Sequence, residues 1–137
     1  MITAIDTNIL IDIFGADPKF GELSVQLLKR CVQEGAIQAC EIVWTETATV
    51  FGDQNTFLEA IQTLGIEFSP MTEEAALLAA EAWRLYRKKG GKRDRVVADF
   101  LIAAHAKTQC DRLLTRDRGF YRNYFESLIV VDPTKTS

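Results

Sequence analysis

Cysteine and histidine are scarce in this sequence. Its 137 residues include three cysteines and one histidine. Cys31, Cys40 and Cys110 are widely spaced and form no CxxC pattern, which argues against a disulfide framework or a zinc site and favours buried, reduced thiols. The single histidine, His105, argues against histidine-based metal sites and against a Ser-His-Asp triad. Carboxylates therefore remain as the candidate chemical groups.

Long hydrophobic runs and a signal peptide are also lacking. No apolar run approaches the roughly 20 residues that span a bilayer, and the N-terminus has no basic segment followed by a small-residue cleavage site. We therefore expect a cytoplasmic protein with no membrane association. The chain length fits one domain, which we place at residues 1–132, with residues 133–137 as a C-terminal tail.

Charge of one sign is not in strong excess, since the formal net charge is −3. This balance does not by itself suggest a nucleic-acid binder. The basic residues are nevertheless clustered: seven of the sixteen lie between residues 84 and 95, around the Gly90–Gly91 pair. A solvated helix end with its loop and a phosphate-contacting patch both explain such a run. The candidate RNA-binding residues of this run are Arg84, Arg87, Lys88, Lys89, Lys92, Arg93 and Arg95.

Short apolar segments alternate along the chain with longer segments of helical spacing. The strand candidates are residues 2–5, 37–44, 66–68, 112–114 and 127–131. Helical spacing from Phe20 to Cys31 stops at Gly35, a second periodic segment stops at Gly65, a third helix begins after Thr72, and a fourth covers residues 96–106. Strands separated by helices predict an α/β fold with a parallel sheet of about five short strands, covered on both faces.

Three acidic residues follow predicted strands. Asp6 ends the first strand, Glu46 follows the second, and Asp117 follows the strand around Leu113–Leu114. Each acid alone is also explained as a helix cap or as a first-turn acid. Because ligands of parallel sheets bind beyond the carboxyl ends of the strands, we expect the three acids to share that edge.

Asp99 is the fourth acid of interest, because it lies in the middle of the apolar helical segment VVADFLIAAHA. Asp94 is the better helix cap, so a buried Asp99 needs a cation or strong donors, and Arg95 is a local candidate. Four carboxylates at one sheet edge repel one another, which raises their pKa values. A hard divalent cation such as Mg²⁺ or Mn²⁺ removes this conflict and suits phosphate chemistry.

Four segments of the chain together resemble the acidic motifs of the PIN-domain nucleases. They are AIDTNILIDIF, the segment of Glu46, ADFLIAAHA and LLTRDRGF, in this order and spacing. The resemblance spans nearly the whole chain and is greatest to the VapC-like ribonuclease toxins of type II toxin–antitoxin modules. It implies a Rossmann-like α/β/α sandwich and a metal-dependent endoribonuclease that cleaves RNA phosphodiester bonds. It also implies one or two Mg²⁺ or Mn²⁺ ions per subunit, a homodimer, and a cognate antitoxin whose tail occludes the site.

The same resemblance assigns roles to single residues. The catalytic, metal-binding acids it implies are Asp6, Glu46, Asp99 and Asp117. The polar positions that orient these acids correspond to Thr7, Asn8 and Thr115.

Other residues near the motifs receive different assignments. Arg116 and Arg118, beside the last acid, join the basic run as candidate contacts to RNA phosphates. The acids outside the match are assigned to the surface or to helix caps: Asp12, Asp94 and Asp111. The residues assigned to packing are His105, Trp44 and Trp83.

Two other functions stay open at this point. A haloacid-dehalogenase-like phosphatase also places an aspartate after its first strand, but it requires a second one two residues later, where this chain has Asn8. A non-catalytic regulatory α/β module would use the acids for a structural ion and the basic run for a partner protein.

Overall fold

A single parallel sheet forms the centre of the protein in the computed structural model, which describes residues 1–91 and 97–135. The strands are β1 (Ile2–Ile5), β2 (Ala36–Ala39), β3 (Ile66–Phe68), β4 (Arg112–Leu114) and β5 (Val130–Val131). Their order in the sheet is β3-β2-β1-β4-β5, and every neighbouring pair is parallel. The predicted α/β fold class is therefore confirmed.

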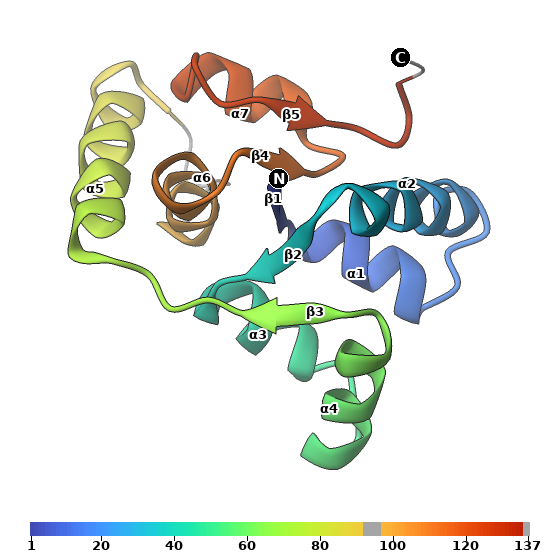
Figure 1. The fold of residues 1–137 in the computed structure, drawn as a ribbon. Coiled ribbons are helices and arrows are strands. Elements are labelled where there is room, and N and C mark those ends of the chain that lie inside the picture. Colours follow the sequence, from blue (N-terminus) through green and yellow to red (C-terminus); the bar gives the residue numbers. More distant parts are fainter. Residues whose placement is uncertain (92–96, 136–137) are drawn as a thin grey trace.

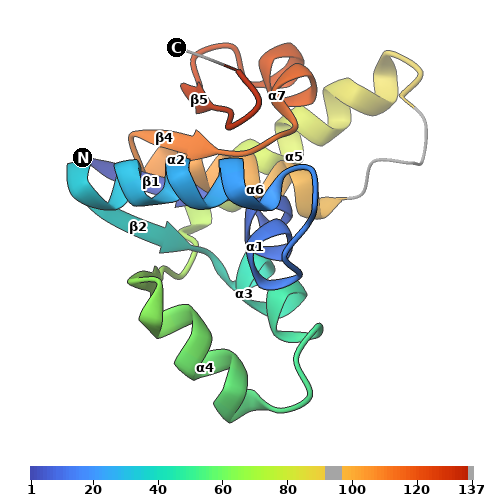
Figure 2. The ribbon, with the colours of Figure 1, turned by 90° about the vertical axis from the view of Figure 1, so that its right-hand side faces the viewer.

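Helices cover both faces of this sheet. They are α1 (Thr7–Phe14), α2 (Gly21–Glu34), α3 (Glu41–Ala48), α4 (Gln54–Thr63), α5 (Glu73–Lys88), α6 (Val97–Gln109) and α7 (Arg118–Tyr124). Figure 1 shows α1 and α2 on one side of the strands and α5 and α6 on the other, while α4 extends beyond the β3 edge. In the view of Figure 2 the strands point toward the side where α6 begins and α5 ends.

The predicted helix signals are found at the ends of the helices. Helix α2 stops at Glu34, directly before Gly35. Helix α5 begins after Thr72, whose hydroxyl accepts a hydrogen bond from the Ala75 N–H at 3.2 Å. The second strand is predicted too long, because the chain leaves β2 at Ala39 and enters α3 at Glu41.

The core lies between the central strands and the helices on both faces. Strand β4 is buried along its whole length, and Phe100 of α6 packs edge-on against Phe120 at a centroid distance of 5.2 Å. His105 is buried and shares a hydrogen bond of 3.0 Å with the Ser69 hydroxyl. Trp44 packs edge-on against Phe57 at 5.4 Å. His105 and Trp44 thus make packing contacts, as predicted from the sequence.

The three cysteines are free thiols. Cys31 and Cys40 are buried, as predicted, whereas Cys110 is only partly buried. Burial raises the pKa of the Cys110 thiol to about 12, so this side chain stays protonated and unreactive at neutral pH.

No helix within residues 1–91 and 97–135 is long and apolar enough to cross a membrane. The described helices and strands all lie within the predicted domain of residues 1–132. The separation of residues 133–137 as a tail stays a prediction.

Candidate active site

One pocket is lined by all four predicted acids. It has a volume of about 320 Å³, and Asp6, Glu46, Asp99 and Asp117 contribute to its wall. Asp6 is the N-cap of α1 and Asp117 the N-cap of α7, while Asp99 lies in the first turn of α6 and Glu46 within α3. Four segments that are distant in the sequence therefore bring carboxylates to one place.

The pairing of β1 with β4 brings the first and last acids together. Ile5 is the register partner of Leu114, and the Asp6 N–H donates to the Leu114 carbonyl at 2.9 Å. Because the two strands are parallel neighbours, the residues that follow them leave the sheet side by side. Asp117 follows β4 by three residues and so lies in the turn beside Asp6.

The Asp6 carboxylate is held by several donors. Its Oδ2 accepts hydrogen bonds from the Thr115 hydroxyl at 2.7 Å and the Tyr121 hydroxyl at 2.9 Å, with the Asn8 amide farther away at 3.5 Å. Its Oδ1 accepts from the Thr7 N–H at 2.7 Å. The residue is 5% exposed, so these bonds replace the water that a buried carboxylate loses.

The predicted orienting residues connect the acids to one another. Asn8 Nδ2 donates to the Thr115 hydroxyl at 3.2 Å, and that hydroxyl accepts from the Asp117 N–H at 3.0 Å. The Thr7 hydroxyl donates to Glu46 Oε1 at 2.7 Å. Hydrogen bonds thus link the turn after β1 to both the turn after β4 and helix α3.

The electrostatics of the pocket disfavour ionisation of Asp6. Burial raises the pKa of Asp6 to about 6, against the lowering effect of the bonds from Thr115, Tyr121 and Thr7, and the negative charge of Asp99 raises it further. The pKa of the Tyr121 hydroxyl lies well above its usual value, first because of burial and then because of the charges of Asp6 and Asp99. Negative charges therefore act on one another across this pocket.

A divalent cation fits the chemistry of these donors. The acids offer only oxygen ligands, which Mg²⁺ and Mn²⁺ prefer, and a bound cation would relieve the conflict that raises the pKa of Asp6. In the described part of the chain, however, no three acidic, histidine or cysteine side chains form a ready-made metal centre. The fit therefore rests on the donor type and on the shared pocket.

Comparison with known protein families assigns this chain to one of them. The sequence profile of the PIN domain matches residues 3–126. This chain belongs to the PIN domain family. The match confirms the resemblance found in the four acidic motifs. No curated protein sequence matches this PIN domain.

Solved structures share the fold of this PIN domain over nearly their whole length. VapBC2 from Rickettsia felis, bound to a DNA fragment from its promoter, aligns with a TM-score of 0.76 and 18% identity, covering 96% of this chain and 98% of that one. VapBC-1 from nontypeable Haemophilus influenzae aligns with a TM-score of 0.75 and 23% identity, covering 98% of this chain and 100% of that one. FitAB bound to the IR36 DNA fragment aligns with a TM-score of 0.73 and 25% identity, covering 100% of this chain and 98% of that one.

Two acids of the PIN domain lie elsewhere on their elements than the sequence predicted. Glu46 does not directly follow β2, because α3 begins at Glu41 and places Glu46 in its second turn. Asp99 is not in the middle of its helix, because α6 begins at Val97. It therefore lies near the positive end of the helix dipole, where a carboxylate is stabilised. Asp94 and Arg95 lie outside the described residues.

The surface assignment of Asp12 is wrong. Asp12 is 3% exposed, and its carboxylate accepts hydrogen bonds from the Arg116 guanidinium and from the Ser24 hydroxyl. It also lines the acidic pocket. Asp111 is exposed, as predicted, and accepts a hydrogen bond from the Ile2 N–H at 2.6 Å.

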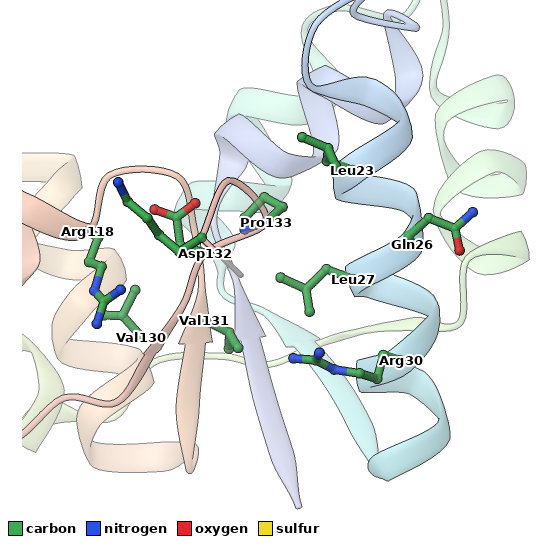
Figure 3. Close-up of a pocket in the computed structure, with 10 residues that line it drawn as sticks. Leu23, Gln26, Leu27, Arg30, Arg118, Val130, Val131, Asp132 and Pro133 are labelled. Carbon is green, nitrogen blue, oxygen red and sulfur yellow. The ribbon is translucent and has the colours of Figure 1, made fainter. Parts of the chain in front are cut away.

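The two arginines beside Asp117 lie in different places. Arg116 lines the acidic pocket. Arg118 lines a hollow of about 570 Å³ between α2 and β5, which shares none of its described lining residues with the acidic pocket. In Figure 3 the side chain of Arg118 lies beside Val130, opposite Leu27 of α2.

The basic run is only partly described. Arg84 forms an ion pair with Glu81, and the Arg87 guanidinium lies over the Trp83 ring at 5.8 Å. These arginines, Trp83 and Lys88 line a surface hollow on α5, and Trp83 is partly buried against the core, as predicted. Lys89 is exposed at the end of α5. The other predicted cations lie outside the described residues: Lys92, Arg93 and Arg95.

Sequence reasoning missed Tyr121 as part of the site. This tyrosine is fully buried and donates to Asp6 from α7. The one signal in the sequence is its position four residues after Asp117, which places both residues on one side of a helix that starts at Asp117.

Proposed function

We propose that this PIN domain is a metal-dependent endoribonuclease and the toxin of a toxin–antitoxin pair. The observation that carries this proposal is the convergence of four carboxylates on one pocket, with burial and Asp99 raising the pKa of Asp6 to about 6. An arrangement that disfavours its own negative charge is typical of a cation site. Family membership and the fold shared with VapBC and FitAB structures support the choice of RNA cleavage.

The residues of the pocket take distinct roles in this proposal. Asp6, Glu46, Asp99 and Asp117 hold one or two Mg²⁺ or Mn²⁺ ions. When bound, these ions would supply the positive charge that stabilises the phosphate during its cleavage. Thr115 and Tyr121 fix Asp6 through their hydroxyls at 2.7 and 2.9 Å, so the first acid keeps one orientation while substrate binds. We expect products with 5′-phosphate and 3′-hydroxyl ends.

Two further residues of the chain position Glu46 and the turn that carries Asp117. Thr7 holds Glu46 Oε1, and Asn8 holds both the Thr115 hydroxyl and the Arg116 N–H, the latter through its Oδ1 at 3.2 Å. The turn that carries Asp117 is thereby tied to helix α1, which carries Thr7 and Asn8. Loss of either side chain should displace an acid without removing it.

RNA would approach along basic parts of the surface. The C-terminal end of α5 lies toward the same side of the molecule as the start of α6, which carries Asp99 (Figure 2). Arg84, Arg87 and Lys88 of this helix end are proposed to contact phosphates, together with Lys89 and the remaining predicted cations. A cognate antitoxin is proposed as a partner because the structural relatives are VapBC complexes. A second copy of the chain is proposed from the family resemblance.

The two other functions have no comparable support. A haloacid-dehalogenase-like phosphatase needs an acid at position 8, where the Asn8 amide instead donates to Thr115. A stable aspartyl-phosphate on Asp6 would be its signature. A purely regulatory module would bind the metal without cutting RNA.

The test is cleavage of a mixed single-stranded RNA pool by purified protein in Mn²⁺ or Mg²⁺. We expect cleavage that EDTA abolishes, and a loss of about 100-fold or more in Asp99→Asn, because an acid of the cation site is removed. Glu59→Gln, which removes an exposed carboxylate on α4, is the matched control and should cut like the parent. Cleavage that persists in EDTA, or parental turnover by Asp99→Asn, would refute the proposal.

A further inference from the structure

Arg116 is held in place on two sides within the acidic pocket. Its Nε donates to Asp12 Oδ2 at 2.6 Å and its Nη2 donates to Asp12 Oδ1 at 3.0 Å. Its guanidinium carbon also lies 4.0 Å from the centre of the Phe20 ring. A two-bond pairing with a carboxylate fixes the plane of a guanidinium, and an aromatic face stabilises its charge.

The groups that hold Arg116 are themselves anchored. The Asp12 side chain is 4% exposed, and its Oδ2 also accepts a hydrogen bond from the Ser24 hydroxyl of α2 at 3.1 Å. The Phe20 N–H donates to Asp17 Oδ1 at 2.8 Å, which fixes the residue just before α2. Asp12 and Phe20 therefore form a rigid support, and we call Asp12, Phe20 and Arg116 the arginine clamp.

The arginine clamp lies within the proposed nuclease site. Arg116 stands between Thr115 and Asp117, and its N–H donates to Asn8 Oδ1 at 3.2 Å. Among the described residues that line the acidic pocket, it is the one cation. An RNA phosphate entering a pocket walled by carboxylates needs positive charge at this place.

Arg116 also keeps hydrogen-bond donors for a ligand. A guanidinium has five N–H groups, and the clamp uses one on Nε and one on Nη2. Within residues 1–91 and 97–135, Nη1 has no hydrogen-bond acceptor. The side chain is 26% exposed, so part of it is open to solvent.

Building on the proposed RNA cleavage, we propose that Asp12 and Phe20 hold Arg116 as a preorganised donor to a non-bridging oxygen of the RNA phosphate. Arg116 is then a substrate-binding residue and Asp12 a positioning residue. A salt bridge that only joined α1 to the turn after β4 would not require the guanidinium to line the pocket or to keep unused N–H donors. Preorganisation matters because a displacement of about 1 Å at a reacting group can cost about 100-fold in rate.

The first experiment measures RNA binding without cleavage. Asp99→Asn protein is titrated with a fluorescent single-stranded RNA oligonucleotide over a series of salt concentrations. Each phosphate contact to a single strand contributes about 0.7 to the slope of log K against log salt. Adding Arg116→Gln should therefore lower the slope by about 0.7, whereas Arg122→Gln, an exposed arginine on α7 outside the acidic pocket, should leave it unchanged.

The second experiment separates positioning from charge in the cleaving enzyme. Asp12→Asn leaves the charge of Arg116 in place but weakens its fixation, so RNA should bind at least as tightly as to the parent. The rate at saturating RNA should fall by about 100-fold. Arg116→Lys keeps the charge and the salt slope but loses the planar two-bond geometry, and it should show the same loss of rate.

A purely structural salt bridge predicts a different pattern. Arg116→Gln and Asp12→Asn would then lower the melting temperature, while the salt slope and the rate of the folded protein stayed at parental values. That result would overturn the arginine clamp as a substrate anchor while leaving RNA cleavage by the parent intact. If the parent does not cut RNA at all but the slope still falls in Arg116→Gln, the nuclease proposal fails and phosphate binding by Arg116 stands. If Arg116→Gln does not fold, Arg116→Lys with an unchanged rate is the contradicting result.

Discussion

At the scale of single residues, folding and the proposed function favour different protonation states of Asp6. Folding buries its carboxylate beside Asp99, and both effects favour the protonated form. Hydrogen bonds from Thr115, Tyr121 and Thr7 favour the ionised form. The pKa of about 6 shows that burial is the larger effect. A cation ligand must be ionised, so the cation proposed above would favour the form of Asp6 that burial disfavours.

The pKa of Asp6 predicts how stability depends on pH in metal-free buffer. Because the pKa is raised from 3.8 to about 6, the folded state holds a proton between pH 4 and 6 that the unfolded chain has released. The contribution of Asp6 to stability must therefore fall as the pH rises through this window, by up to about 3 kcal/mol. The free energy of unfolding by urea, measured with EDTA present in the parent and in Asp6→Asn, should show this fall in the difference between the two proteins.

Asp53 provides a control of opposite sign for this experiment. Its pKa is lowered, chiefly by the hydrogen bond from the Thr56 N–H. Asp53→Asn should therefore remove stability that is present above pH 4 and is lost on acidification. If the parent and Asp6→Asn differ by the same amount at pH 4 and pH 7, the raised pKa of Asp6 is contradicted.

The sequence indicates the acids that line the pocket more clearly than the groups that hold them. Asp6, Asp99 and Asp117 can be selected because each follows a strand or interrupts an apolar helix. Asp12 cannot, because its partner Arg116 is 104 residues away in the sequence. Tyr121 is 115 residues from its partner Asp6, so its spacing from Asp117 is the one signal for it. In the sequence, the residues around a buried aspartate that pairs with a distant arginine look the same as those around an exposed aspartate.

At the scale of elements, the helix N-termini place the acids. Asp6 and Asp117 occupy N-cap positions and Asp99 a first turn, so three carboxylates lie at the positive ends of helix dipoles. This local stabilisation offsets part of the mutual repulsion. The elements themselves are predictable from apolar spacing and capping residues, as Gly35 and Thr72 show.

The boundary between β2 and α3 is the element-scale feature that the sequence hides. Residues 36–44 are apolar except for Gln38 and Glu41, and a mainly apolar segment of this length does not distinguish a strand from a buried helix. Packing decides instead, since Trp44 must reach Phe57 and Phe68 at 5.4 and 5.2 Å. Glu46 is consequently presented from a helix.

The turn between α2 and β2 offers a test of how the elements are joined. Gly35 has a φ of +156°, and a Cβ placed there would lie 1.8 Å from the Met1 carbonyl oxygen. Gly35→Ala should therefore cost about 2 kcal/mol or more in the free energy of unfolding. Gly52→Ala is the matched control, because no heavy atom lies within 4 Å of its Cβ. Equal urea midpoints for the two variants would contradict this account.

At the scale of the whole molecule, the strand order fixes where a ligand can bind. Strand β1 pairs with β2 on one side and with β4 on the other, so the order of strands reverses between β1 and β4. Open parallel sheets bind ligands outside the carboxyl ends of the strands at such a point. Asp6 and Asp117 follow these two strands, and Asp99 and Glu46 join them from α6 and α3.

The shared-site claim is tested most directly by melting the protein with and without Mn²⁺. An ion at about 100 times its dissociation constant stabilises the folded state by about 2.7 kcal/mol, which should raise the melting temperature of the parent by about 10 °C. Glu59→Gln should show the same rise. Asp99→Asn and Asp117→Asn should both show a much smaller one. Equal rises in the parent and in both variants would contradict a cation held jointly by these acids.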